Sequence, residues 1–295
     1  MHIGNSTFDR CDEAKAILRS DGYLLLRSCF DLDEVARLNL RFQKWRREAA
    51  AHRYDFGDIN SGKRRFVLGA NHSEYSPSIK RINNPCDVDA EFFDFVLVKQ
   101  IVPLAQYFLG EFVRFHHCKI NCKSGPADGA VDLHQDFGFD PHTNRSLLTF
   151  VVPLDDVSKV SGCLEVVPKS HLKLLSHFKN NRFVGAIPNG WAIYNTLLLP
   201  IELNMGDCLV LDGALIHGSR PNTTQKQRPI LFSEFSAVDA LPLAAYHVPS
   251  IHSGKIFPAT NKVFPIRLEA QTLEVPGTYS ASSIFDLQHE ERSRE

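Results

Sequence analysis

Three residues of this sequence have the types and spacing of a site for a redox-active metal. His134 and Asp136 are separated by one residue, and His217 follows later in the chain. In an extended segment the side chains at positions i and i+2 point to the same face, so His134 and Asp136 can offer a nitrogen and an oxygen to one ion. Two histidines and one carboxylate form the facial triad that binds non-haem Fe(II) and leaves other coordination positions open.

The His-x-Asp triplet alone also fits a surface histidine beside a solvated aspartate, because the chain has 13 His and 34 Asp or Glu. A second feature favours the metal site. His217 lies in a short, strand-like stretch, and Arg228 begins the next one. An arginine on a neighbouring strand can bind a carboxylate through two parallel N–H donors. The sequence therefore predicts a metal and, close to it, a cationic site for an acid.

The composition narrows the class of protein. With 295 residues, 43% hydrophobic and 23% charged, the chain fits an ordinary globular protein of one large or two small domains. A net charge of −1 gives no basic field for nucleic acid or an anionic membrane. No run of 18 apolar residues predicts a membrane span, and the N-terminal residues lack the order of a signal peptide. Seven dispersed cysteines indicate reduced thiols, and we expect a cytoplasmic protein.

The elements that must position these residues begin with helices. Apolar spacing predicts a short helix over 9–20, a strand over 22–30 and a longer helix from 31 to about 53, with Asp31 as its N-cap and Glu34 completing a capping box. Residues 55–90, rich in Gly and Pro, are expected to form a long, partly ordered loop, and loops of this kind often serve as functional lids. A second helix is expected over 91–110, divided at Pro103.

From residue 111 the pattern changes to β-structure. Strand-like stretches lie at 113–123, 131–136, 147–154, 162–168, 208–212, 214–218 and 229–235, and residues 169–205 form an insertion between them. About seven short strands separated by turns favour a sandwich or barrel over alternating βα units.

The motifs occur in an order that resembles the phytanoyl-CoA dioxygenase family of Fe(II)- and 2-oxoglutarate-dependent oxygenases, over roughly residues 20–236. The matching motifs are His134-Gln-Asp136, Leu154-Asp-Asp156, Gly162-Cys-Leu, Val167-Pro-Lys-Ser-His171, Gly206-Asp207 and His217-Gly-Ser219 followed by Asn222 and Arg228. Lys169 stands where the family usually has Gly, in a supporting loop outside the ligand set.

The resemblance implies a mainly β fold with flanking α-helices around a double-stranded β-helix, a cupin-like jelly roll. Residues 1–295 would form a single dioxygenase domain, with N-terminal helices in 1–110, the jelly-roll core in about 111–240 and a C-terminal extension in 241–295. It also implies His134, Asp136 and His217 as iron ligands. Arg228, Ser219 and Asn121 would bind 2-oxoglutarate, and O₂ is the other cosubstrate. Candidate substrate-binding residues are Gln135, Phe137, Phe139, Lys119, Lys123 and Arg65.

The implied reaction is the hydroxylation, or the desaturation or cyclisation, of a small molecule, with release of succinate and CO₂. We expect its setting to be specialised metabolism. Asp136 favours hydroxylation because family halogenases have a small residue in its place. The alternative is a jelly-roll protein that binds a metal or small ligand without redox chemistry. Arg228 and Ser219 distinguish the oxygenase from this alternative, since a bound diacid such as 2-oxoglutarate explains the presence of both. We expect a monomer or homodimer, and the motifs do not choose the substrate.

Overall fold

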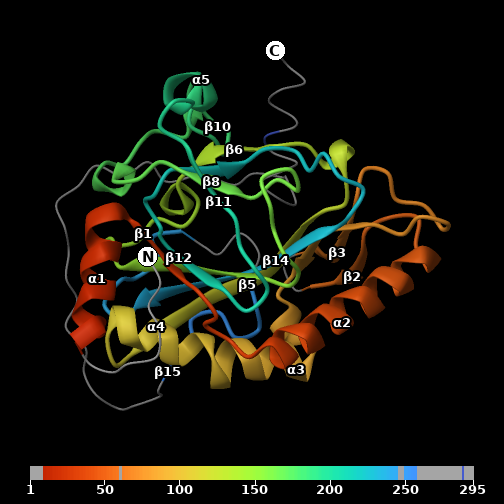
Figure 1. Ribbon diagram of the computed structural model, residues 1–295, viewed down its shortest axis with the longest axis horizontal. Helices are drawn as coiled ribbons and strands as arrows, with labels where there is room; N and C mark the ends of the chain where they lie inside the picture. Colours follow the sequence, from red (N-terminus) through yellow and green to blue (C-terminus); the bar gives the residue numbers. More distant parts are fainter. Residues whose placement is uncertain (1–8, 60–61, 245–248, 258–287, 289–295) are drawn as a thin grey trace.

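The computed structural model describes residues 9–59, 62–244, 249–257 and 288 (Figure 1). A large antiparallel sheet contains, in spatial order, β1 (Tyr23–Leu26), β12 (Cys208–Asp212), β7 (Leu147–Pro153), β14 (Arg228–Ala237), β5 (Val113–Lys123), β4 (Ile79–Asn83), β3 (Arg64–Leu68) and β2 (Phe56–Asp58), and β15 (Ile256–Phe257) also pairs with β5. A small sheet contains β11 (Leu199–Ile201), β8 (Leu164–Val166), β13 (His217–Ser219) and β6 (Val131–His134). Strands β9 (Phe178–Lys179) and β10 (Arg182–Phe183) form a separate hairpin.

The helices lie mostly on one side of the large sheet (Figure 1). They are α1 (Asp9–Asp21), α2 (Leu32–Glu48), α3 (Ala90–Phe93), the π-helix η3 (Asp94–Lys99) and α4 (Ile101–Leu109), whereas α5 (Gly190–Tyr194) contacts β6 in the small sheet. Short 3₁₀ turns are η1 (Ala49–Ala51), η2 (Pro85–Asp87), η4 (Pro126–Asp128), η5 (Asp136–Gly138) and η6 (Ser170–Leu172).

Two apolar layers follow from strand alternation. The outer face of the large sheet packs against the helices, with Phe115, Phe150 and Phe235 in one cluster with Phe42 and Phe92. The inner face packs against the small sheet through a second cluster that joins Ile230 and Phe232 to Leu164 and other residues. Because successive side chains of a strand point to opposite faces, each central strand serves both layers. The predicted jelly-roll architecture is confirmed.

Residues 55–90 do not form the predicted loop. Strands β2, β3 and β4 extend the large sheet beyond β5, so this stretch is part of the sheet. The glycines and prolines that suggested a loop sit at the ends of short strands, except Gly57, which lies within β2. In strands of three to five residues the turn signals outnumber the strand signals, which is why the sequence pattern was misleading.

The predicted division of the second helix at Pro103 is also wrong. The chain leaves α-helical geometry earlier, in η3, and α4 begins at Ile101 after Gln100. Pro103 lies in the first turn of α4, where a backbone N–H has no acceptor within the helix and its absence costs little. The whole segment Ala90–Leu109 is long and apolar enough to cross a membrane by composition. Its residues Phe92, Phe95 and Ile101 are buried in the core beneath the sheet, as in a core helix.

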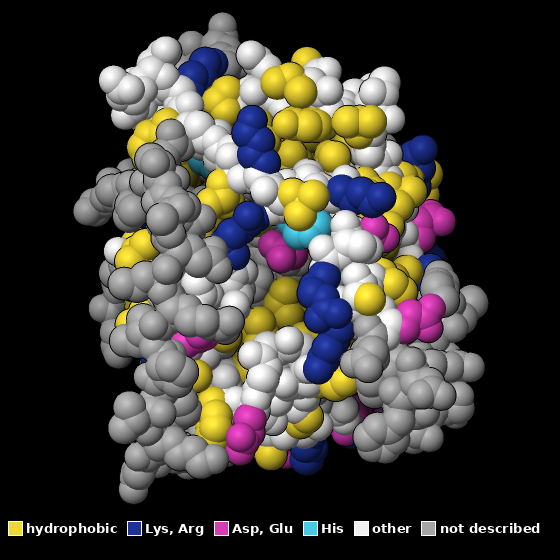
Figure 2. All heavy atoms as spheres, turned by 90° about the vertical axis from the view of Figure 1, so that its left-hand side faces the viewer, with side chains coloured by type: hydrophobic (Ala, Val, Ile, Leu, Met, Phe, Trp, Pro, Cys, Tyr) yellow, Lys and Arg dark blue, Asp and Glu magenta, His cyan; other side chains and the backbone are white. Residues whose placement is uncertain are grey.

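One face of the molecule carries charges of both signs. In the view of Figure 2, Lys and Arg side chains gather near the middle of the face beside a histidine and acidic side chains, with apolar side chains between them. This mixture agrees with the net charge of −1.

The N-terminus of α2 is capped as predicted, with one difference. Asp31 Oδ1 accepts from the backbone N–H groups of Asp33 and Glu34 at 2.9 and 3.2 Å. Glu34 does not complete a capping box, because its Oε2 accepts from Gln100 Nε2 at 2.7 Å and so ties α2 to the start of α4.

We expect Asp31→Ala to lower the free energy of unfolding by about 1 kcal/mol, because two N–H groups lose their acceptor. Asp31→Asn is the matched control, since asparagine caps equally well and should stay close to wild type. Urea unfolding followed by circular dichroism measures both. Equal stability of the Ala and Asn variants would show that this cap contributes nothing.

Candidate iron and 2-oxoglutarate site

The two histidines of the predicted triad lie opposite each other on paired strands. His134 is the last residue of β6, His217 is the first of β13, and the register of the antiparallel pair places them together. Their ring centroids are 4.2 Å apart. Gly218 allows this close pairing, because a Cβ at that position would lie 2.7 Å from the carbonyl oxygen of Val131.

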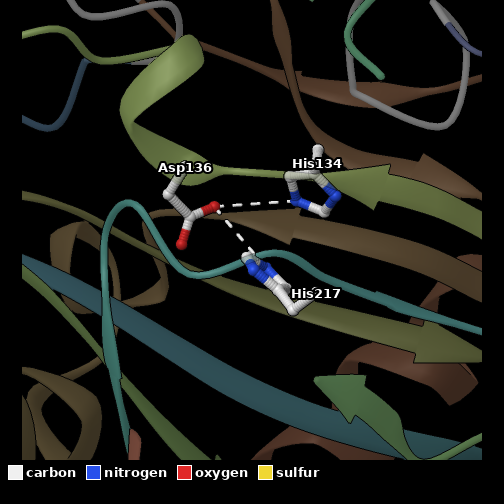
Figure 3. Close-up of side chains that lie close together, drawn as sticks. All are labelled: His134, Asp136 and His217. Carbon is white, nitrogen blue, oxygen red and sulfur yellow. Dashed lines mark ion pairs between the residues drawn. The ribbon is translucent and has the colours of Figure 1, made fainter. Parts of the chain in front are cut away.

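Asp136 reaches the same point from just beyond the strand. It starts η5 instead of continuing β6, so the strand geometry expected for the triplet holds only as far as Gln135. Its Oδ1 lies 3.7 Å from His134 Nε2 and 3.8 Å from His217 Nε2 (Figure 3). Its Oδ2 accepts a hydrogen bond from Thr149 Oγ1 at 2.7 Å. One carboxylate oxygen is thereby directed at the histidines and the other is held by the large sheet.

Both imidazoles are oriented by backbone carbonyls. His134 Nδ1 lies 2.8 Å from Asp132 O, and His217 Nδ1 lies 3.0 Å from Leu215 O. A carbonyl oxygen only accepts, so each Nδ1 carries the proton and each Nε2 keeps its lone pair for a metal. This pattern of support is typical of metal-binding histidines.

The electrostatics of the site favour the protonation states that a metal requires. Burial lowers the pKa of His217 to about 4, and the neighbouring His134 adds to the effect. His217 is therefore neutral at pH 7. Burial opposes ionisation of Asp136, but the neighbouring His217, His134 and Lys119 outweigh it and hold the pKa of Asp136 well below its ordinary value. A neutral His217 imidazole beside an ionised carboxylate fits a divalent cation.

Arg228 is placed to bind an acid in the same pocket. It begins β14 and lines the pocket with the triad, Asn121 and Ser219. Arg228 Nε and Asn121 Oδ1 are buried and have no hydrogen-bond partner among the described residues. Burial lowers the pKa of Arg228 to about 10, so the guanidinium stays charged at neutral pH. A buried cation without a counter-ion fits the distal carboxylate of 2-oxoglutarate.

The other predicted substrate residues divide into two groups. Lys119 and Phe139 line the pocket, and the Phe139 ring meets that of His134 edge to face at 5.7 Å. Lys123 instead donates to Ser219 O and Arg220 O, and Arg65 Nη1 donates to Asn83 O and Asn84 O.

Gln135 and Phe137 also face away from the pocket. Gln135 donates to Lys173 O and accepts from the backbone N–H of Leu175, while Phe137 packs against Leu147 and Ala214. The predicted role in substrate binding is therefore replaced by a structural role for four residues: Gln135, Phe137, Lys123 and Arg65. The predicted structural role of His171 agrees with its contact to Arg19 O at 3.1 Å.

Four residues near the site were not predicted from the sequence. Thr149 holds Asp136, and Arg81, Asp140 and Phe232 line the pocket. The stretch Ile79-Lys-Arg-Ile-Asn83 has two adjacent basic residues and no apolar alternation, so its pattern gave no signal that singles out Arg81. Arg81 was missed because the stretch was taken as a loop.

A second group of potential ligand atoms lies deeper among the described residues. His117, Asp140 and Glu234 bring a nitrogen and two carboxylates within 4.8 Å of one another, all buried. Burial, with Asp140 and Asp136, raises the pKa of Glu234 well above its ordinary value. A raised pKa makes a carboxyl group a weaker metal ligand than one whose pKa is lowered, so this group contrasts with the triad.

Comparisons with known proteins identify the family. The model of the family described as phytanoyl-CoA dioxygenase (PhyH) matches residues 18–230, well over half of the chain. The chain belongs to the phytanoyl-CoA dioxygenase family. It is 28% identical over 276 residues to a probable alpha-ketoglutarate-dependent hypophosphite dioxygenase of Stutzerimonas stutzeri, covering 90% of this chain and 93% of the relative. It is 24% identical to the human peroxisomal phytanoyl-CoA dioxygenase, covering 77% of this chain and 68% of the relative.

Solved structures agree with the fold. EctD from S. alaskensis, in a structure with 2-oxoglutarate and 5-hydroxyectoine, superposes with a TM-score of 0.62 at 22% identity, over 80% of this chain and 79% of that one. The epimerase SnoN from nogalamycin biosynthesis superposes with a TM-score of 0.60 at 19% identity, over 92% of this chain and 96% of that one. Family membership and the His-Asp-His site confirm the predicted cofactors, Fe(II), 2-oxoglutarate and O₂. The protein is a 2-oxoglutarate-dependent dioxygenase of this family.

We expect His217→Ala to abolish stoichiometric Fe(II) binding, because one of three protein ligands is lost. His171→Ala is the control: it removes another buried histidine, one that contacts Arg19 O, and should keep its iron while losing stability. Metal analysis after anaerobic loading, with melting temperatures, distinguishes the two. Full iron occupancy in His217→Ala would remove His217 from the ligand set.

Arg228→Gln should raise the KM for 2-oxoglutarate by roughly 30-fold to several thousand-fold, since truncating a buried charge partner costs about 2–5 kcal/mol. Arg220→Gln is a matched control, because Arg220 pairs with Glu165 at 3.1 Å near the same strands but is half exposed. Succinate release measured at varied concentrations of 2-oxoglutarate gives the KM of each variant. An unchanged KM for Arg228→Gln would place the carboxylate elsewhere.

Proposed function

We propose that this dioxygenase is a hydroxylase that transfers one oxygen atom of O₂ to a small molecule, while 2-oxoglutarate becomes succinate and CO₂. The observation that carries the proposal is the carboxylate of Asp136. It fills the third protein position beside His134 and His217, and Thr149 holds it there. A halogenase needs that position for a halide, so the chain's own residue favours oxygen transfer.

The bound iron and 2-oxoglutarate supply the oxidising power, and the protein's residues position the reactants. Arg228 holds the distal carboxylate of 2-oxoglutarate by charge, and Ser219 and Asn121 line the same part of the pocket. Phe139 and Phe232 contribute apolar surface to the lining of the pocket. Desaturation and cyclisation begin with the same hydrogen abstraction. The naming of the Stutzerimonas relative as a dioxygenase of hypophosphite supports an outcome in which oxygen is added.

The proposed setting is specialised metabolism in the cytoplasm. Six described cysteines are free thiols, and Cys118 Sγ and Cys86 Sγ lie 3.1 Å apart without a disulfide. Such a pair supports a reducing compartment. Microscopy of a fluorescently tagged chain tests the location, and accumulation in an oxidising compartment would contradict it.

The proposed reaction is tested with isotopically labelled oxygen. The purified protein, with Fe(II), 2-oxoglutarate and labelled O₂, is incubated with a metabolite panel, and succinate and product masses are measured. We expect substrate-dependent succinate and one labelled oxygen atom in the product. A product that has lost two hydrogens without gaining oxygen, or that carries chlorine from chloride buffer, would refute hydroxylation.

A further inference from the structure

Two basic side chains line the pocket in addition to Arg228. Lys119 lies on β5 and Arg81 on the neighbouring strand β4, and both border the pocket with the iron ligands. Arg81 is 1% exposed, so its charge is held away from solvent. Arg81 Nε donates to Asn83 Oδ1 at 2.7 Å, which fixes the direction of the guanidinium. Burying a charged side chain costs desolvation free energy, so the presence of Lys119 and Arg81 in this pocket requires a reason.

The strand register separates Lys119 from the 2-oxoglutarate side. Asn121 lies opposite Ile230, whereas Lys119 lies opposite Phe232 and Asn83. The two rows are two residues apart along β5, roughly 7 Å at about 3.4 Å per residue. Arg81 itself lies opposite Asn121, but its Nε donates to the side chain of Asn83, which lies opposite Lys119. The guanidinium of Arg81 is thereby directed along the strands toward Lys119.

Lys119 has no hydrogen bond or ion pair with any described residue, and its Nζ lies 5.9 Å from the centroid of the Phe232 ring. Burial lowers the pKa of Lys119, and the like charge of Arg81 lowers it further, while Asp136, Glu234 and Asp140 raise it. Of these acids, Asp136 is directed at the metal site, and Asp140 and Glu234 belong to the second buried group with His117.

We propose that Lys119, with Arg81 beside it, binds an oxyanion group of the substrate. This inference rests on the proposed function, because it assigns the substrate of the same pocket. The chemical class is a small phosphonate, phosphinate or carboxylate, whose remaining part packs on Phe139 and Phe232. An anion between two cations removes their mutual repulsion and presents the rest of the substrate to the iron ligands. The Stutzerimonas relative, a probable hypophosphite dioxygenase, is consistent with this class, because hypophosphite is a phosphorus oxyanion.

Binding without turnover tests the assignment. Isothermal titration calorimetry uses the full chain with Zn(II) in place of iron and saturating 2-oxoglutarate. The probes are hypophosphite, ethylphosphonate, propionate and the uncharged 1-propanol. We expect at least one oxyanion to bind wild type and 1-propanol not to bind. Comparison of ethylphosphonate with propionate distinguishes phosphorus oxyanions from carboxylates.

Two variants of Lys119 isolate the charge. Lys119→Gln should weaken oxyanion binding at least about 10-fold, whereas Lys119→Arg should stay within about 3-fold of wild type. Retained 2-oxoglutarate affinity shows that each variant is folded. Equal binding by the Gln variant, binding of 1-propanol as tight as that of the anions, or no oxyanion bound by wild type at about 10 mM would each overturn the proposal.

Failure of the proposed reaction would look different. Oxyanion binding that depends on Lys119, with no labelled oxygen in any product, would leave the binding site standing and refute hydroxylation. Hydroxylation of a neutral molecule that is insensitive to Lys119→Gln would confirm the reaction and refute the binding site.

Discussion

The pairing of β13 with β6 is the constraint on which the rest of the site depends. It places His217 directly opposite His134, and backbone carbonyls then turn both rings so that their Nε2 atoms converge. A shift of one residue would move His217 to the other face of the small sheet, because side chains alternate along a strand. On its other edge β13 pairs with β8, so the strand is held from both sides. The metal site is therefore a property of sheet register.

The large sheet contributes a different kind of support. On β5, Cys118, Ile120 and Cys122 face the helices and belong to the main apolar cluster. The alternate residues Lys119 and Asn121 face the pocket. The apolar face of β5 packs against the helices and fixes the strand. Its polar face can therefore hold charged groups in a buried pocket while the strand stays paired in the sheet. The helices thus serve the chemistry indirectly, by stabilising the far side of the strands that line the pocket.

The sequence predicted the centre of the site better than its surroundings. The triad and Arg228 could be predicted from the sequence because they lie in or next to strands that have strong β patterns. Substrate residues were harder, because proximity in sequence does not give direction. Gln135 lies between two ligands yet faces the loops at Lys173 and Leu175, as strand alternation requires. Arg81 was missed because recognising it needed a strand that only pairing with β5 reveals.

Gly218 allows the backbones of the two strands to set the distance between the two histidines. With no Cβ to meet Val131 O, the backbones of β13 and β6 approach until their own hydrogen bonds stop them. Phe139 and Phe232, which line the substrate end of the pocket, are not among the atoms nearest to Gly218. A scaffold built in this way can change what it oxidises while its metal-binding geometry stays constant, which separates the evolution of specificity from that of reactivity.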